Sequence, residues 1–334
     1  MILVVCLNPA LDVTHYVPAV DWAGVNRPTA VHTRPGGKGL NVARTLHALG
    51  ADVLLMGLAG GDTGRVVAAA LRQAGVPSAL IPISGPTRHT FTVVDDAGTT
   101  ASFNEAGPGV TPHEFDSLRM AYLEALATAD AVVLSGSLPP GLPVTTYATL
   151  IQAAAAAGIP VLLDSNGAAL LRGVSAGPAI VKPNLDELAG ATGKVLSPSG
   201  GVSSCGGVFA CGGVSASGTV DRAAVREAAT QLRAAGAEAV VASLGPAGLL
   251  AVTAEGSWHA WPSAVAAGNA TGAGDAVAAA LVHGLVTRRP WDERLRHAVA
   301  LGAAAVAAPV AGEFRRESYL AGLRPVAVRL EEVR

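Results

Sequence analysis

The chain has 334 residues, with 23 basic and 25 acidic side chains, a formal net charge of −2 and a hydrophobic content of 50%. The near-neutral balance argues against nucleic acid as the main partner, and the high hydrophobic content with only 14% charged residues excludes a disordered chain. Three cysteines without metal-ligand spacing, a strand-like N-terminus and the lack of any run of about 20 apolar residues predict a cytoplasmic protein without a signal peptide or membrane span.

Short apolar runs alternate with helical patterns along most of the chain. The runs are rich in Val, Ile and Leu without polar alternation, which is typical of strands buried on both faces. They lie at residues 2–7, 53–58, 131–134, 161–163, 239–242 and 248–252. The stretches with helical periodicity lie at residues 40–49, 64–74, 112–127, 144–157 and 221–235. This alternation predicts one α/β domain over residues 1–334, with a doubly wound, mostly parallel sheet flanked by helices.

Three segments interrupt this alternation. Residues 10–35 contain three prolines and are predicted to be extended, and residues 86–105 are predicted to form a hairpin around an Asp-Ala-Gly turn. Both segments are expected to pair into a small sheet beside the main one, with separate surface hairpins as the alternative. Residues 197–218 consist almost entirely of Ser, Gly, Val and Cys, which predicts a flexible insertion.

The sequence NATGAGDA at residues 269–276 comes directly before a run with helical periodicity at residues 277–285. Its glycines are therefore expected at the start of a helix, where free backbone N–H groups and the helix dipole favour an anion such as a phosphoryl group. Asp275 could there accept the proton of an attacking hydroxyl group. An ordinary N-capping aspartate after a glycine turn is the alternative.

A second glycine turn, PGGKGLNVAR at residues 35–44, opens another predicted helix with Lys38 and Asn41 in its first turns. It lacks both the spacing of a Walker A motif and the Ser or Thr after the lysine. A glycine turn with Lys and Asn side chains suits sugar hydroxyls or a phosphate. Lys38 is one of only three lysines among the 23 basic residues, and a second, Lys182, also falls in a motif. A compact ammonium group is not interchangeable with a guanidinium group where space beside phosphate is tight.

Lys182 opens the sequence KPNLDE at residues 182–187, which begins a predicted helix. Asn184 has the position of an N-cap residue there and Glu187 completes a capping box, which explains the helix start but not Lys182. Arg88, in the predicted hairpin, could bind a phosphate through two N–H groups, although most surface arginines have no such role.

Three further segments follow predicted strands, and ligands gather at strand ends in open α/β sheets. They are residues 8–12 (NPALD), 135–141 (SGSLPPG) and 243–248 (SLGPAG). The third is a tight glycine loop on whose backbone a nucleotide could lie. Ordinary turns are the alternative for each segment taken alone.

In this order the motifs resemble those of the ribokinase-like, PfkB-type carbohydrate kinases across nearly the whole chain. The most specific pair is GGKGLN at residues 36–41 and GAGD at residues 272–275. The segments at residues 8–12 and 135–141 narrow the likeness to the branch that acts on sugar phosphates, which contains 1-phosphofructokinase and tagatose-6-phosphate kinase.

The resemblance implies ATP-dependent phosphorylation of a sugar phosphate, with Mg²⁺ and with Asp275 as the catalytic base. It assigns the γ-phosphate to the backbone amides of Gly272, Ala273 and Gly274. It assigns the sugar phosphate to Asp12, Gly37, Lys38, Asn41, Arg88 and Ser137. It assigns ATP to Lys182, Asn184, Ser243, Gly245, Gly248 and Gly274, and Mg²⁺, through water, to Glu187. The small sheet at residues 10–35 and 86–105 would be a lid, which in relatives often also forms a dimer interface.

The expected acceptor is D-fructose 1-phosphate, and tagatose 6-phosphate, fructose 6-phosphate and an unphosphorylated hexose remain alternatives. A second hypothesis is a non-catalytic sugar or nucleotide sensor on the same fold, but a pure binding protein needs no base such as Asp275. A nicotinamide-dependent oxidoreductase is disfavoured because no Gly-x-Gly-x-x-Gly follows the first predicted strand. The expected partners are therefore small molecules and a second copy of the chain, with no nucleic acid and no membrane.

Overall fold

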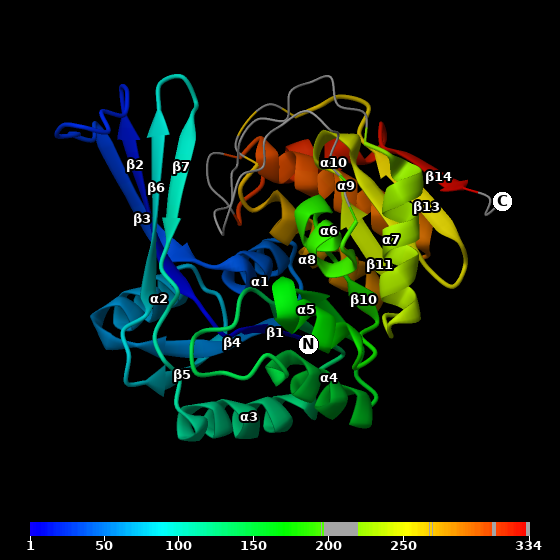
Figure 1. Cartoon of the computed structure of the whole chain (residues 1–334), viewed down its shortest axis with the longest axis horizontal. Helices are drawn as coiled ribbons and strands as arrows, with labels where there is room; N and C mark the ends of the chain where they lie inside the picture. The colour runs from blue at the N-terminus through cyan, green and yellow to red at the C-terminus, as the bar shows by residue number, and fades with distance from the viewer. Residues whose placement is uncertain (195, 197–219, 267, 269, 309–311, 332–334) are drawn as a thin grey trace.

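The computed structural model describes residues 1–194, 196, 220–266, 268, 270–308 and 312–331 (Figure 1). The predicted insertion at residues 197–218 lies outside the described residues. None of the helices in the described ranges is long and apolar enough to cross a membrane.

The main sheet, as described, contains ten strands in the order β14-β13-β12-β11-β10-β9-β8-β1-β4-β5. Neighbouring strands are parallel from β5 to β11, whereas β12, β13 and β14 pair antiparallel at one edge. The strands are β1 (Ile2–Cys6), β4 (Val53–Gly60), β5 (Ser78–Ile83), β8 (Ala131–Ser135), β9 (Val161–Asp164), β10 (Ile180–Val181), β11 (Val240–Ser243), β12 (Leu249–Val252), β13 (Ser257–Trp261) and β14 (Ala327–Glu331). The predicted mostly parallel sheet is confirmed.

Helices cover both faces of this sheet, and each face has its own hydrophobic core. One core contains residues of α1 (Lys38–Ala48), α2 (Gly61–Gln73), α8 (Ala273–Val286), α9 (Trp291–Val306) and α10 (Arg316–Leu323). The other contains residues of α3 (Pro112–Leu126), α4 (Thr146–Ala156), α5 (Gly167–Val174), α6 (Leu185–Thr192) and α7 (Arg222–Ala234). In β1, Ile2 and Val4 pack into the first core and Leu3 and Val5 into the second. The strand is apolar throughout because both of its faces are buried.

A second sheet has the strand order β3-β2-β6-β7 and projects beside α1 and α2 (Figure 1). Its strands are β2 (Ala10–Val17), β3 (Ala30–Gly36), β6 (Arg88–Asp95) and β7 (Thr100–Asn104). Strands β6 and β7 form the predicted hairpin, and β6 pairs parallel with β2. The two segments therefore form one small sheet, as predicted, and not separate surface hairpins.

The predicted element boundaries differ from those of the structure mainly at short or edge elements. The sequence patterns did not indicate β5, β13, β14, α5 or α10. Strand β13, for example, has the sequence SWHAW, which is not a run of Val, Ile and Leu, and it pairs antiparallel with β12.

Candidate active site

The carboxyl ends of the central parallel strands open into a cavity of about 1530 Å³. Residues at the end of four of these strands, or one or two positions after it, line the cavity, namely Asn8, Asp164, Lys182 and Ser243. All residues that the sequence singled out as catalytic or binding line this cavity: Asp12, Gly37, Lys38, Asn41, Arg88, Ser137, Lys182, Asn184, Glu187, Ser243, Gly245, Gly248, Gly272, Ala273, Gly274 and Asp275. The fold thus brings together segments from both ends of the chain.

Asp275 lies in the first turn of α8 and is only 6% exposed. No side chain caps this helix, and Gly272 occupies the N-cap position with φ 85°. The carboxylate of Asp275 instead accepts a hydrogen bond from Asn41 Nδ2 of α1, with a distance of 2.9 Å to Oδ2. The alternative reading of Asp275 as a helix-capping residue is therefore wrong.

Burial raises the pKa of Asp275 to about 7, and the negative charge of Asp164 acts in the same direction. Lys38, the hydrogen bond from Asn41 and Lys182 oppose this shift. A carboxyl group whose pKa lies close to neutral pH can exchange a proton with a hydroxyl group more readily than an ordinary surface aspartate.

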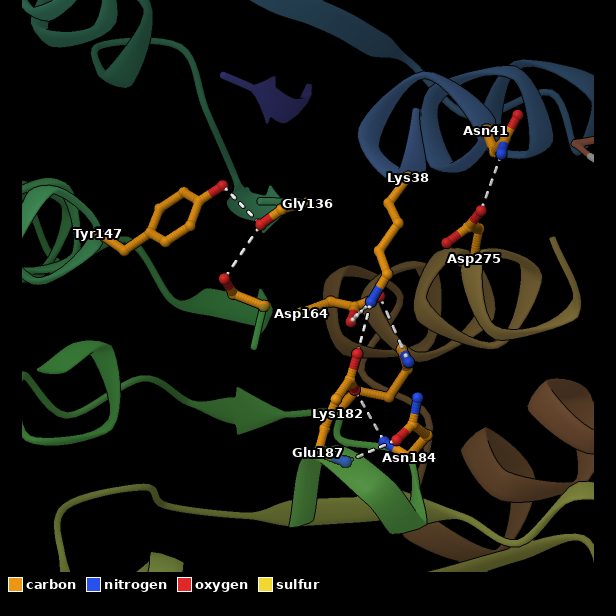
Figure 2. A network of polar contacts seen from close by, with 10 residues as sticks. Lys38, Asn41, Gly136, Tyr147, Asp164, Lys182, Asn184, Glu187 and Asp275 are labelled. Atoms are coloured by element: carbon orange, nitrogen blue, oxygen red, sulfur yellow. Dashed lines mark hydrogen bonds and ion pairs between the residues drawn. The ribbon is translucent and has the colours of Figure 1, made fainter. Parts of the chain in front are cut away.

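A network of two lysines and two carboxylates lies beside Asp275 (Figure 2). Lys38 Nζ is 3.1 Å from Asp164 Oδ1 and 2.9 Å from Glu187 Oε1. Lys182 Nζ is 3.3 Å from Asp164 Oδ2. Lys182 is 3% exposed and the Asp164 side chain is fully buried, so these charges balance one another with little help from water.

The electrostatics of the network follow from its geometry. Burial opposes the charged form of Lys38, but the carboxylates of Asp164, Glu187 and Asp275 outweigh burial and raise its pKa. Burial likewise opposes the charged form of Asp164, but Lys182 and Lys38 together lower its pKa. Lys38 is therefore a positively charged anchor beside Asp275.

Lys182 reaches the glycines at the start of α8. A Cβ atom placed on Gly274 would lie 3.5 Å from Lys182 Nζ. The ammonium group therefore adjoins the positive end of the α8 dipole, and both favour an anion at this point of the cavity.

Asn184 and Glu187 form the predicted capping box at the start of α6. Asn184 accepts a hydrogen bond from the Glu187 backbone N–H (2.7 Å), and Glu187 Oε2 accepts one from the Asn184 backbone N–H (2.9 Å). The other oxygen of Glu187 binds Lys38. Glu187 therefore joins the helix start to the charged network.

Asp164 is a site residue that the sequence reasoning missed. It ends β9, and a polar residue at the carboxyl end of a buried strand is the signal that could have found it. Its role follows from its contacts with Lys38, which is 126 residues away, and with Lys182, which directly follows the next strand of the sheet, and no local pattern shows these contacts.

The small sheet contributes Asp12 of β2 and Arg88 of β6 to the lining of the cavity. Arg88 donates hydrogen bonds to the backbone carbonyls of Asn8 (3.3 Å) and Glu105 (3.1 Å), which fix its guanidinium group. Asn8 Nδ2 in turn donates to Ser137 Oγ (3.1 Å), and Asn8 Oδ1 is buried without a hydrogen-bond partner. A buried acceptor of this kind suits a ligand that brings a hydroxyl group.

Asp12 is held against the turn that precedes α1. A Cβ atom on Gly36 would lie 2.0 Å from the Asp12 carboxylate, so only glycine permits this approach. Burial raises the pKa of Asp12, and the charges of Arg34 and Arg88 oppose that rise. Arg34, which pairs with Asp12 across β2 and β3, also lines the cavity and was not singled out from the sequence.

The chain is similar to known sugar kinases over nearly its whole length. Residues 1–316 match the model of the pfkB family carbohydrate kinases. The chain is 31% identical to 1-phosphofructokinase of Escherichia coli K12 over 302 residues, which cover 90% of this chain and 89% of the relative. It superposes on the solved structure of E. coli phosphofructokinase-2 with potassium with a TM-score of 0.83 and 30% identity, over 96% of this chain and 97% of that one.

The same E. coli enzyme has also been solved in complex with fructose-6-phosphate, and that structure matches with a TM-score of 0.81 and 30% identity, over 96% of this chain and 97% of that one. The matches to the family and to the curated relative both span most of the chain. The chain therefore belongs to the pfkB family of carbohydrate kinases and is a phosphotransferase that acts on an alcohol group.

Proposed function

We propose that the protein transfers the γ-phosphoryl group of ATP to D-fructose 1-phosphate, forming fructose 1,6-bisphosphate, with Asp275 as the general base. The observation that carries the proposal is the buried Asp275 carboxylate at the start of α8, in a cavity that is also lined by the cationic side chains of Lys38, Arg88 and Lys182. The relationship to a 1-phosphofructokinase favours fructose 1-phosphate as the acceptor. The solved complex of phosphofructokinase-2 with fructose-6-phosphate supports that sugar as an alternative acceptor. Tagatose 6-phosphate is a further alternative that rests on the sequence resemblance alone.

Asp275 accepts the proton of the attacking hydroxyl group as its oxygen bonds to the γ-phosphorus. Asn41 holds the carboxylate in one orientation through its Nδ2–H. We assign the stabilisation of the transferred group's negative charge to the backbone N–H groups of Gly272, Ala273 and Gly274, of which that of Ala273 also donates to the Ala270 carbonyl oxygen (3.2 Å). The positive end of the α8 dipole acts in the same direction.

In this proposal Lys182 binds one substrate, ATP, and two other cationic groups bind the sugar phosphate. Lys182, beside Gly274, binds the ATP phosphates, and Asn184 and the loop from Ser243 through Gly245 to Gly248 contact the nucleotide. Asp12, Gly37, Asn41 and Ser137 hold the sugar. Lys38 and Arg88 bind its phosphate.

Kinases of this family use ATP as the phosphoryl donor, generally with Mg²⁺. Mg²⁺ prefers oxygen ligands and keeps several waters, so it fits a site in which the ATP phosphates supply its direct contacts. Glu187 would bind water molecules that coordinate the ion. One of its carboxylate oxygens accepts a hydrogen bond from Lys38 and the other accepts one from the Asn184 N–H, and each oxygen has a second lone pair that can accept a bond from water. The ion, when bound, neutralises phosphate charge as the phosphoryl group moves.

The small sheet acts as a lid in this proposal. One face of it lines the cavity with polar side chains, including Asp12, Thr90 and Thr92. Closing it over the sugar would exclude water and limit ATP hydrolysis.

The cytoplasmic location of the protein stays a prediction.

The other face of the small sheet exposes apolar side chains, including Val31 (53%), Phe91 (36%) and Phe103 (54%). We infer that two copies of the chain cover these faces in a homodimer. Sedimentation velocity should then show a dimer that Phe103→Glu converts to monomers, and a monomeric wild-type protein at micromolar concentration would contradict the inference.

The proposed activity is tested by ADP release with fructose 1-phosphate, fructose 6-phosphate, tagatose 6-phosphate and fructose. We expect the highest kcat/KM for fructose 1-phosphate. A higher value for another sugar phosphate would reassign the acceptor. ATP binding without turnover on any of the four sugars would support the non-catalytic sensor instead.

The pH dependence of the reaction should reflect the raised pKa of Asp275. The base must be ionised to act, so kcat/KM should fall about tenfold per pH unit below pH 7 and stay constant just above it. The pH profile of the residual activity of the Asp275→Asn variant serves as the control, because its substrates ionise as in the wild-type reaction but the variant lacks the base. A wild-type profile without a break between pH 5.5 and 8 would contradict this prediction.

Arg88→Ala should weaken binding of the phosphosugar and leave the nucleotide unaffected. Loss of hydrogen bonds to a charged phosphate costs roughly 1.5–3 kcal/mol, so KM for the sugar phosphate should rise by about 10- to 100-fold. KM for ATP should change by less than about twofold, since Arg88 lies at the sugar end of the cavity. Arg119→Ala, at an exposed arginine on α3, is the matched control. Equal increases in both KM values would refute the assignment of Arg88.

A further inference from the structure

His259 lies on β13, directly behind the glycine loop that follows β11. It is 7% exposed, and its Nε2 is 3.0 Å from the backbone carbonyl oxygen of Ala247. Its Nδ1 is 2.6 Å from Nη1 of Arg222 at the start of α7. The ring stacks on Trp261 with 4.6 Å between centroids and 21° between planes. The imidazole is therefore held on three sides.

These contacts favour one tautomer of the neutral His259 imidazole. A guanidinium group can only donate hydrogen bonds, so Nδ1 must accept the bond from Arg222. The proton of a neutral ring is then on Nε2, which donates to the Ala247 carbonyl. Burial lowers the pKa of His259 and favours this neutral form. Glu331 of β14 holds Arg222 from the other side, 3.6 Å away, and also pairs with Arg226.

Ala247 belongs to the loop between β11 and β12, whose other side faces the cavity. Gly245, Pro246 and Gly248 line the cavity, whereas Ala247 is held from behind by His259. The loop lies flat on β13, because a Cβ atom on Gly248 would be 2.0 Å from the carbonyl oxygen of Ala260. Gly248 has φ 89°, a conformation that glycine adopts readily, and the turn is closed by backbone hydrogen bonds from Leu244 N–H to Gly248, from Ala247 N–H to Leu244 and from Gly248 N–H to Gly245. None of these three bonds uses the Ala247 carbonyl oxygen, which is the atom that His259 contacts.

We propose that His259 is a positioning residue for the nucleotide. By fixing the carbonyl of Ala247, it holds the segment from Gly245 to Gly248 in the shape that receives ATP, and Arg222 and Glu331 hold the imidazole in turn. A loop that is already ordered loses less conformational entropy when a ligand binds. The inference rests on the proposed function, in which the nucleotide lies on this loop.

The test compares His259→Leu with His259→Gln in steady-state kinetics and in calorimetric binding of a non-hydrolysable ATP analogue. His259→Leu removes the donor to Ala247, and we expect KM for ATP and the Kd of the analogue to rise by about tenfold. KM for the sugar phosphate and kcat at saturating ATP should stay within about twofold of the wild-type values. His259→Gln keeps an N–H donor at the reach of Nε2 and should restore most of the ATP affinity.

Thr253→Val is the matched control. Thr253 is buried at the other end of the β12–β13 hairpin, where its hydroxyl group donates to the carbonyl of Gly256 (3.1 Å). The control should lose stability without a change in KM for ATP. Equal rises in KM for ATP in Thr253→Val and His259→Leu would overturn the inference, as would an unchanged Kd of the analogue in His259→Leu. A wild-type protein that does not bind the analogue would overturn the proposed function together with the inference.

Discussion

Asp275→Asn should lower kcat by about 10³-fold, because a positioned general base contributes about 10²- to 10⁴-fold to proton transfer. The amide can still accept the hydrogen bond from Asn41, so the shape of the site is retained. The KM values for ATP and the sugar phosphate should change by less than about threefold, since this carboxylate acts on the reacting proton. Initial rates of ADP release at saturating substrates measure the effect.

Asp62→Asn is the matched control for Asp275→Asn. Asp62 also lies in the first turn of a helix, α2, but its side chain is 88% exposed and pairs with Arg65. This control should keep wild-type kcat. A kcat in Asp275→Asn within tenfold of the wild type would contradict the assignment of Asp275 as the base.

Stability provides a check that Asp275→Asn folds. The pKa of Asp275 is about 7 in the folded chain and 3.8 is its ordinary value, so the folded state binds the proton more tightly than the unfolded state. Ionisation of this group therefore lowers stability as the pH rises from about 4 to 7. At pH 8 the asparagine variant should be at least as stable as the wild type.

Asp164→Asn should lower the free energy of unfolding by about 3–5 kcal/mol, because removal of one partner from a buried ion pair leaves a buried charge uncompensated. Asp164 is in contact with both Lys38 and Lys182, and Lys182 is 3% exposed. Urea unfolding measures the change. The double variant Asp164→Asn/Lys182→Met should regain part of the loss, because it no longer buries that lysine's charge.

Asp116→Asn is the control for this stability measurement. Asp116 pairs with Arg119 on α3 at 3.3 Å, but both side chains are exposed. Its replacement should leave the unfolding free energy unchanged within error, as is usual for surface ion pairs. An Asp164→Asn variant as stable as the Asp116→Asn control would contradict the charge balance described for the network.

The parts of the fold that could be predicted from the sequence are those set by local chemistry. Strand β1 is apolar throughout because it is buried on both faces, and the capping box of Asn184 and Glu187 involves residues three apart. The glycine turn before α8 likewise indicates the helix start that holds Asp275. Each of these signals is contained within a few residues.

The parts that escaped prediction depend on contacts between distant segments. Asp164 appears as an ordinary strand end until Lys38, 126 residues away, is brought against it. His259 lies in the short strand β13, between β12 and β14, and its contacts with Ala247 and Arg222 follow from the antiparallel end of the sheet. Short elements such as α5 and α10 are stabilised by packing on neighbouring elements, α10 on α9 for example, more than by their own helix propensity, so their sequences show weak patterns.

The most direct test of the central claim is ³¹P NMR of a reaction that contains the protein, ATP, Mg²⁺ and fructose 1-phosphate. The proposal predicts that the wild-type protein converts ATP to ADP and forms a product with two phosphomonoester signals, and that Asp275→Asn forms neither at a comparable rate. Release of inorganic phosphate without a sugar bisphosphate, or an equal rate of bisphosphate formation in Asp275→Asn, would contradict it.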